Sequence, residues 1–219
     1  MIYGISKATW RVLGTLLWRL ELRGAENVPP SGGVILAANH QSFLDVVLLA
    51  SFTKRPVRYM ARSTLWESRI LGWIISDLRA VPFNREKPGK EEMRGLLGIV
   101  RGGEVLALFP EGTRTLDGSI GEFLGGIGFF ARKGGAPVVP VLIRGSFEAW
   151  PRGRSLPRPG RIRIDFGRPV MYDDSWEDRE LAADIRRRLL VLRDGPDAPR
   201  PEPEQGRAAC APLGGEGAA

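Results

Sequence analysis

The sequence has almost none of two residues that often build catalytic and metal sites. Among 219 residues there is one histidine, His40, and one cysteine, Cys210. A single histidine cannot form a multi-histidine metal site, and a single cysteine cannot form a disulfide within the chain. We therefore expect no metal site, nothing indicates an oxidising compartment, and Cys210 is interpreted as an incidental thiol.

Long apolar runs and several functional motifs are also missing. Residues 2–20 start as an apolar segment, but Lys7, Arg11 and Arg19 interrupt it, so we expect no membrane span and no signal peptide. There is no G-x-S-x-G motif to indicate a nucleophilic serine. The net charge of +7 would suit nucleic acid or an anionic membrane surface. Because no nucleic-acid-binding motif accompanies that charge, a nucleic-acid-binding module is a distant alternative.

Residues 2–20 have the pattern of an amphipathic helix. Its predicted polar face carries Lys7, Arg11, Thr15 and Trp18. Its predicted apolar face carries Ile2, Ile5, Val12, Leu13, Leu16, Leu17 and Leu20. Two interpretations stay open. The helix could pack on the core of its own domain, or it could lie in a bilayer interface with its basic residues and tryptophans at the headgroups.

The rest of the chain alternates between short apolar runs and longer periodic ones. Strands are predicted at 33–39, 57–61, 79–83, 104–110, 136–145 and 161–167, and helices at 42–52, 64–78, 91–101, 121–134 and 175–193. This alternation predicts an α/β domain with a mostly parallel central sheet covered by helices. The aromatic stripe of the 64–78 helix is more typical of a core than of a ligand wall. We expect an N-terminal helix at 1–24, a globular domain at 25–193 and a disordered Pro/Gly/Ala-rich tail at 194–219.

Polar segments follow four of the predicted strands. They are NHQSFLD at 39–45, NRE at 84–86, PEGTR at 110–114 and RG at 144–145. In open α/β sheets, ligands bind in the crevice outside the carboxyl ends of the strands. We therefore expect these segments to meet at one edge of the sheet.

His40 and Asp45 can be interpreted in two ways. If Ser42 caps the following helix, Asp45 falls at its third position, and S-x-x-D is a capping box that needs no catalytic explanation. Asp45 could instead bond to the Nδ1–H of His40 and fix its tautomer, so that Nε2 could take a proton from a hydroxyl group. Since no serine or cysteine nucleophile is indicated, that hydroxyl would belong to a substrate.

The segment Phe109–Thr115 suits a phosphate. Its Gly112 and Thr113 amides could point outward beside the Arg114 guanidinium, and Glu111 would then organise the site. A surface turn with a Glu and Arg pair would explain the same residues. Two weaker signals of a site are Arg85 and Pro140. Arg85 would supply a further cation for a phosphate, whereas a bent or edge strand would explain Pro140 without any function.

The order of these four segments, from about Val34 to Gly145, resembles the four-block signature of the glycerolipid acyltransferase family, whose central members are the 1-acylglycerol-3-phosphate acyltransferases. The resemblance implies the glycerolipid acyltransferase fold and transfer of a fatty acyl group from acyl-CoA or acyl-carrier protein to the free hydroxyl of 1-acylglycerol-3-phosphate. The product would be phosphatidic acid, in phospholipid biosynthesis. Another lysolipid, such as a lyso-ornithine lipid or a lysophospholipid, is the alternative acceptor. No bound cofactor is implied, and the expected location is the cytoplasmic face of the cell membrane, as a monotopic or peripheral protein.

The resemblance also assigns site residues. It implies His40 as general base with Asp45 as its orienting partner, a phosphate site, and an acyl-donor side that includes Pro140. The implied phosphate-site residues are Arg85, Glu111, Gly112, Thr113 and Arg114. One departure is visible, because Leu124 stands where many family members have a lysine. Arg132 and Lys133 are the expected substitutes for that charge.

Overall fold

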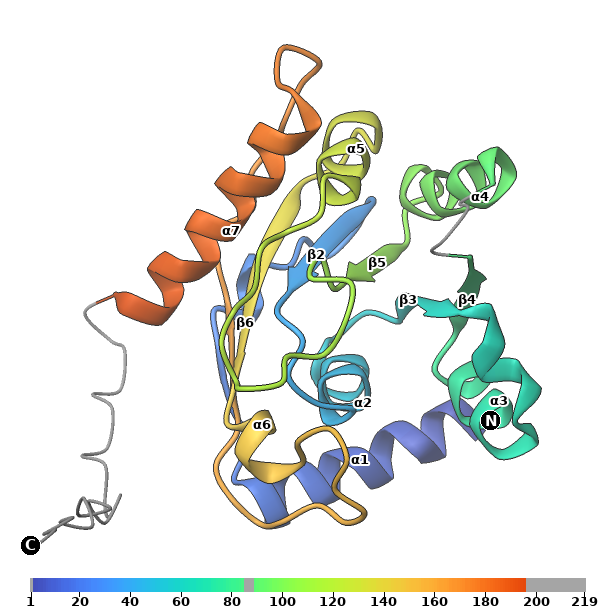
Figure 1. The fold of residues 1–219 in the computed structure, drawn as a ribbon, viewed down its shortest axis with the longest axis vertical. Coiled ribbons are helices and arrows are strands. Elements are labelled where there is room, and N and C mark those ends of the chain that lie inside the picture. The colour runs from blue at the N-terminus through green and yellow to red at the C-terminus, as the bar shows by residue number, and fades with distance from the viewer. Residues whose placement is uncertain (1, 85–88, 196–219) are drawn as a thin grey trace, which may run out of the picture.

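Seven strands form one sheet in the residues that this computed structural model describes, which are 2–84 and 89–195 (Figure 1). Their order is β1-β7-β6-β2-β5-β3-β4. All neighbouring strands are parallel except β6 and β7, which are antiparallel. The bounds are β1 (Glu21–Arg23), β2 (Val34–Ala38), β3 (Val57–Arg62), β4 (Ala80–Phe83), β5 (Val105–Leu108), β6 (Val138–Arg144) and β7 (Arg163–Phe166).

Helices cover both faces of the sheet. They are α1 (Ile2–Trp18), α2 (Leu44–Phe52), α3 (Arg69–Asp77), α4 (Lys90–Arg101), α5 (Gly126–Lys133), α6 (Ser146–Ala149) and α7 (Asp178–Asp194), with 3-10 turns η1 (Ala25–Asn27) and η2 (Ser63–Glu67). Successive residues of β2 point to opposite faces, with Leu36 in the core under α2 and Ile35 in the core under α4, α5 and α7. Both faces of the central strand are therefore buried, as its continuous apolar run predicted.

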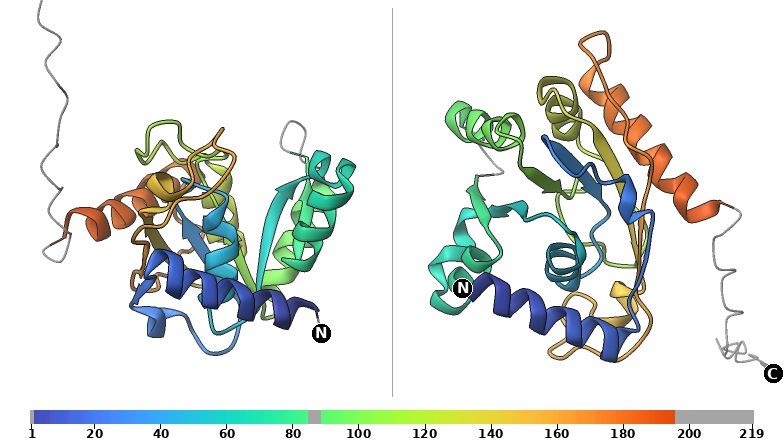
Figure 2. Two further views of the ribbon diagram at one scale, coloured as in Figure 1. Left: turned by 90° about the horizontal axis from the view of Figure 1, so that it is seen from below. Right: turned by 180° about the vertical axis from the view of Figure 1, so that it is seen from behind.

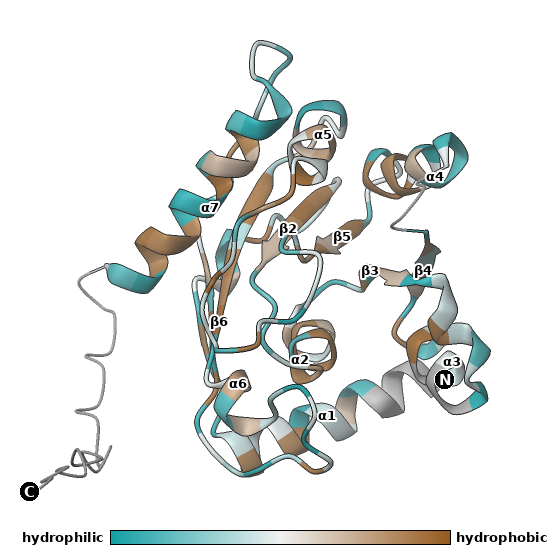
Figure 3. Cartoon of the chain, viewed as in Figure 1, coloured by the Kyte–Doolittle hydropathy of each residue, from teal (hydrophilic) through white to brown (hydrophobic). Residues whose placement is uncertain are grey.

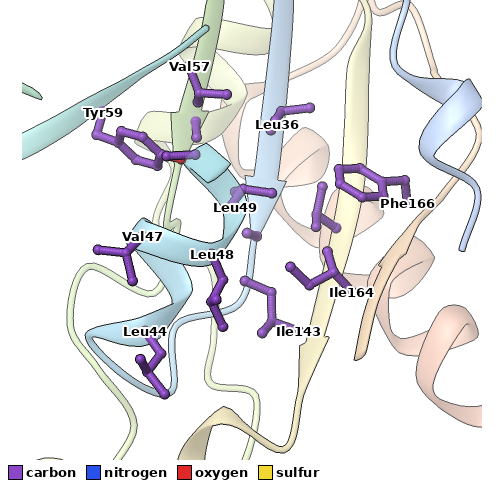
Figure 4. Packing of buried hydrophobic residues seen from close by; sticks show 14 of the residues in the cluster. Leu36, Leu44, Val47, Leu48, Leu49, Val57, Tyr59, Ile143, Ile164 and Phe166 are labelled. Atoms are coloured by element: carbon purple, nitrogen blue, oxygen red, sulfur yellow. The ribbon is translucent and has the colours of Figure 1, made fainter. Parts of the chain in front are cut away.

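α2 lies against the sheet and is apolar on nearly every side. Figure 4 shows Leu44, Leu48 and Leu49 of this helix packed against side chains of the strands. Burying each such leucine contributes about 1.5–3 kcal/mol. α1 crosses the outer side of α2 (Figure 2). The two helices approach closely at Gly14, where a Cβ would lie 2.7 Å from the ring of Phe52.

α1 turns its basic residues toward α2. Lys7 Nζ donates to the Thr53 carbonyl oxygen at 2.8 Å, and Arg11 Nε donates to that of Ser51 at 2.7 Å. Burial, and secondarily the charge of Arg11, lower the pKa of Lys7. The two cations lie at the end of α2 where the helix dipole is negative, so they stabilise its unsatisfied carbonyl groups.

The exposed side of α1 includes apolar residues. Leu16 and Val12 are 72% and 56% exposed, and Leu17 is also exposed, whereas Trp18 is only 1% exposed and donates from Nε1 to the Arg158 carbonyl oxygen at 2.8 Å. The predicted helix is therefore present, and its predicted faces are correct only in part. Leu13 and Leu20 pack on the core as expected, but Trp18 is buried and Val12, Leu16 and Leu17 turn outward. Ile2 and Ile5 have no described side-chain environment.

Most predicted elements are found with shifted bounds, and four regions differ. The expected helix at 64–78 is divided into η2 and α3. Trp73 is 62% exposed, so the expectation that the aromatic stripe of this helix lies in the core is wrong for Trp73. α5 starts at Gly126 rather than 121, and β1 and α6 were not predicted. The tail prediction falls almost entirely on 196–219, outside the described residues. In the described part of the chain, no helix is long and apolar enough to cross a membrane.

Candidate active site

The segment that carries His40 leaves the carboxyl end of β2, in the middle of the sheet. The residue before it, Asn39, is fully buried, and its side chain bonds twice to β6. Asn39 Nδ2 donates to the Ile143 carbonyl oxygen at 2.9 Å, and the Ile143 amide donates to Asn39 Oδ1 at 2.7 Å. Asn39 thus fixes the start of the His40 segment to the neighbouring strand, a role that the sequence did not reveal.

A single oxygen of Asp45 binds both the imidazole of His40 and the backbone amides of the two residues that follow His40. Its Oδ2 lies 2.9 Å from His40 Nδ1 and accepts the amides of Gln41 and Ser42 at 2.6 and 2.7 Å. The carboxylate is fully buried, and Oδ1 has no hydrogen-bond partner among the described residues. An Nδ1–H donated to this carboxylate leaves Nε2 of His40 as the acceptor nitrogen.

The capping interpretation is compatible with this arrangement. α2 begins at Leu44, with Phe43 as the residue before it, one position later than predicted. Ser42 Oγ nevertheless accepts the Leu44 amide at 3.2 Å, while Asp45 accepts the Ser42 amide. The same hydrogen bonds that order the first turn of the helix therefore also place the carboxylate beside His40.

The imidazole ring lies flat against Phe109 at the end of β5. The ring centroids are 4.1 Å apart with an interplanar angle of 22°, and the His40 side chain is 14% exposed. No partner of Nε2 occurs in the described residues. The ring is thus fixed on one edge by Asp45 and on one face by Phe109, and it forms part of the wall of a cavity.

Glu111 connects the PEGTR segment to the His40 segment. Its Oε1 accepts the His40 amide at 2.8 Å, and its Oε2 accepts the Gly121 amide at 3.0 Å. Burial raises the pKa of Glu111, although both amide hydrogen bonds and the nearby His40 oppose that shift. Since both oxygens bind backbone amides, the carboxylate is placed to organise the loops rather than to contact a phosphate.

Two further hydrogen bonds join these loops. The Thr115 amide donates to the His40 carbonyl oxygen at 2.9 Å, and Gln41 Nε2 donates to that of Gly118 at 2.8 Å. The carboxyl ends of β2 and β5 therefore form one hydrogen-bonded unit. Two of the four polar segments, NHQSFLD and PEGTR, therefore meet at one edge of the sheet as expected.

Gly112 has a structural role that differs from the one expected. Its amide donates to the Phe109 carbonyl oxygen at 3.0 Å, so the prediction that this amide points outward is wrong. Its φ is +72°, and a Cβ there would lie 2.8 Å from Leu124. Only glycine adopts this turn without strain. Thr113 and Arg114, the next two residues, do line the cavity.

The cavity has a volume of about 410 Å³ and both apolar and basic residues in its lining. Most of its lining residues are apolar, among them Phe43, Val46, Tyr59, Leu65, Ile75 and Leu78. Besides His40, three arginines line it, which we call the arginine mouth: Arg62, Arg114 and Arg152, of which Arg62 and Arg152 are exposed. No acidic residue lines the cavity in the described parts of the chain. Burial, and secondarily the charge of Arg152, lower the pKa of Arg114.

The remaining predicted site residues lie elsewhere. Pro140 is buried in β6, an interior strand that pairs with β2, so the edge-strand interpretation is wrong and Pro140 does not line the cavity. Arg132 and Lys133 form ion pairs with Asp174 or Asp178, and neither lines the cavity. Leu124, which stands in its place, is exposed. Arg85 lies outside the described residues.

Comparison with known proteins supports the pattern read from these segments. The family model described as Acyltransferase matches residues 19–144. A chloroplastic 1-acyl-sn-glycerol-3-phosphate acyltransferase of Brassica napus is 30% identical over 157 residues, which are 70% of this chain and 45% of that protein. A 1-acyl-sn-glycerol-3-phosphate acyltransferase of Bacillus subtilis is 27% identical over 79% of this chain and 84% of its own length.

A solved structure is similar over most of the chain. The crystal structure of the 1-acyl-sn-glycerophosphate acyltransferase PlsC from Thermotoga maritima has a TM-score of 0.71 and 26% sequence identity, covering 88% of this chain and 80% of that one. The chain spans less than half the length of the chloroplastic relative. Because the family model covers more than half of the 219 residues and the fold agrees with a solved member, this chain belongs to the acyltransferase family.

Proposed function

We propose that this protein transfers a fatty acyl group from a thioester, acyl-CoA or acyl-carrier protein, to the free hydroxyl of 1-acylglycerol-3-phosphate. One observation carries the proposal: His40 lies in the wall of a cavity whose lining combines many apolar residues with arginines that have no carboxylate partner among the described residues. A substrate of this site should have a long apolar part and an anionic head. Lysophosphatidic acid has both, with its reactive hydroxyl between them.

The residues of the site suit direct transfer between the two substrates. His40 Nε2 takes the proton of the acceptor hydroxyl, and Asp45 stabilises the imidazolium that forms. The hydroxyl oxygen attacks the thioester carbonyl carbon, the carbon–sulfur bond breaks, and the departing thiolate takes the proton from His40. The thioester supplies the activated acyl group, so the reaction requires no further cofactor.

The names of the relatives support the same acceptor. The chloroplastic and Bacillus proteins are both named 1-acyl-sn-glycerol-3-phosphate acyltransferases, and the Thermotoga structure is titled as a lysophosphatidic acid acyltransferase. The cavity gives a physical reason for such an acceptor. Arg114 provides a charge-assisted hydrogen-bond donor for a phosphate, and the Thr113 amide has no acceptor in the described residues.

An acceptor panel tests the proposal. The purified chain would be given radiolabelled acyl-CoA with 1-acylglycerol-3-phosphate, with a lysophospholipid whose phosphate is a diester, or with a lyso-ornithine lipid. We expect the highest kcat/KM with 1-acylglycerol-3-phosphate. A higher value with a lyso-ornithine lipid, which has no phosphate, would show that the arginine mouth serves another acceptor. Absence of product with every acceptor would reject acyl transfer.

We also propose that α1 attaches the protein to the surface of an anionic bilayer. Its exposed residues Val12, Leu16 and Leu17 form an apolar surface that the fold leaves without a partner. Because Lys7 and Arg11 bind carbonyl groups of α2, the contact through α1 would depend on these apolar side chains more than on its charges.

A pair of matched substitutions tests this attachment. Leu16→Glu introduces a charge on α1, and Val191→Glu introduces one at a similarly exposed apolar position on α7. Binding to vesicles of phosphatidylglycerol and phosphatidylcholine would be measured by co-sedimentation. Since burying a leucine is worth about 1.5–3 kcal/mol, we expect Leu16→Glu to weaken binding by at least about 10-fold and Val191→Glu to leave it unchanged. Equal binding by all three proteins would make α1 purely structural.

A further inference from the structure

The segment between α6 and β7 is basic and had no role in the sequence analysis. It reads PRGRSLPRPGR from Pro151 to Arg161 and includes arginines at 152, 154, 158 and 161. Only one of the four, Arg152, lines the cavity that contains His40. The segment follows a strand end that neighbours β2, so the fold brings it to the site from a position more than a hundred residues after His40.

Arg152 is held by a turn that is attached to the His40 segment. Trp150 Nε1 donates to the Arg154 carbonyl oxygen at 2.8 Å, which closes the turn around Arg152. Ser42 Oγ donates to the Trp150 carbonyl oxygen at 2.7 Å, and the rings of Phe43 and Trp150 meet edge to face at 5.9 Å. The backbone of Arg152 is therefore positioned relative to His40 by contacts on both sides of the turn.

No described residue neutralises the charge of Arg152. Other arginines of the fold are paired, for example Arg144 with Asp165 and Arg188 with Asp184. Arg114 and Arg152 have no carboxylate partner in the described residues, and they lie close enough for the charge of Arg152 to lower the pKa of Arg114. Two like charges that line one cavity repel each other. An anion that binds both is attracted to each of them and offsets this repulsion.

We propose that Arg152 binds the phosphate of the acceptor together with Arg114 and thereby selects a phosphomonoester. This inference rests on the proposed function. Two guanidinium groups can donate several hydrogen bonds to one phosphate, and each donor is strengthened by its charge. A phosphomonoester carries more negative charge than a phosphodiester, so a second cation favours lysophosphatidic acid over lysophospholipids with a further headgroup. Arg152 would in this way determine acceptor specificity.

Steady-state kinetics of Arg152→Ala test the inference. Loss of one charge-assisted hydrogen-bond donor at an exposed site should raise the KM for 1-acylglycerol-3-phosphate about 10-fold, with kcat and the KM for acyl-CoA nearly unchanged. The preference for this acceptor over a lysophospholipid whose phosphate is a diester should fall. Arg152→Lys should recover part of the loss, because it keeps the charge but not the planar donor pair.

Arg154→Ala is the matched control, because Arg154 lies in the same turn and does not line the cavity. It should keep the kinetics of the wild-type protein. In the double variant Arg114→Ala/Arg152→Ala, the effects on the acceptor KM should be less than multiplicative, since both residues bind one group. An unchanged acceptor KM in Arg152→Ala, or a rise in the KM for acyl-CoA alone, would overturn the assignment. Those outcomes differ from failure of the proposed function, in which the wild-type protein does not acylate this acceptor at all.

Discussion

On the His40 side of the cavity the polar groups bond to one another, whereas the arginines at its mouth bond to no carboxylate of the described residues. His40, Asp45 and Glu111 are connected through ring, carboxylate and backbone amide hydrogen bonds, at 2.6 to 3.0 Å. Arg114 and Arg152 have neighbours of like charge instead. The difference indicates that the first side is organised before substrate binds, as a catalytic base requires, whereas under the proposal the second side is completed by an anionic ligand.

The largest effect should come from His40→Ala. Loss of a general base typically lowers kcat about 10²- to 10⁴-fold, and we expect the KM for the acceptor to change little, because the arginines remain. Product formation from a labelled acyl donor measures kcat, and a thermal melt verifies the fold. Turnover close to that of the wild-type protein would remove His40 from the mechanism.

Asp45→Asn should have the next largest effect. The asparagine oxygen can still accept the Gln41 and Ser42 amides, but the charge that stabilises the imidazolium is lost, so we expect kcat to fall on the order of 10²-fold. An NH₂ group at the position of Oδ1 would be buried without an acceptor, at a cost of about 1–3 kcal/mol in the free energy of unfolding. An unchanged kcat together with lowered stability would assign Asp45 to helix capping alone.

Arg114→Ala should act on binding instead of turnover. We expect the acceptor KM to rise about 10-fold, which corresponds to loss of one charged hydrogen bond, and kcat to stay within a few-fold of wild type. Arg187→Ala, on the exposed side of α7, provides a control for the loss of one positive charge. A fall in kcat as large as that of His40→Ala would mean that the two sides of the cavity are not functionally separate.

Glu111→Gln should have the smallest effect of these substitutions, and its effect on Tm should depend on pH. Burial raises the pKa of Glu111 above its ordinary value of 4.5, so its contribution to stability is fully present below pH about 4.5 and is lost as the pH rises through the folded-state pKa. Glutamine does not titrate. The Tm of the wild type minus the Tm of the variant should therefore be more positive at pH 5 than at pH 8. A value that becomes more positive toward pH 8 would contradict the direction of the pKa shift.

Local patterns predicted more of the fold than of the site. The strands were recognisable because their apolar runs are buried on both faces, but α5 starts five residues late for a reason that no local pattern contains. The amides of Gly121 and Leu124 bind Glu111 and the Pro110 carbonyl oxygen, respectively, which ties this stretch to the PEGTR segment. Long-range hydrogen bonds here override local preference.

The proposed phosphate site shows the same division. Arg114 was predicted from the PEGTR segment, but Gly112 proved to close the turn, and Arg152 gave no signal because its own segment resembles an ordinary basic loop. Its proximity to Arg114 depends on the packing of β6, α6 and the His40 segment. A single sequence does not encode that proximity in any spacing.

The sequence by itself determined the alternation of strands and helices and the pairing of His40 with Asp45, because both depend on residues within a few positions of one another. Only the tertiary structure decided which side of α1 faces outward. α7 buries Leu181, Ile185 and Leu189 and exposes charged side chains, as amphipathic helices usually do. Figure 3 shows hydrophobic and hydrophilic residues alternating along this helix. α1 exposes Leu16 instead, because the end of α2 offers carbonyl groups that its basic residues bind. Helical periodicity shows that a helix has two faces, and the neighbouring elements decide which of them is buried.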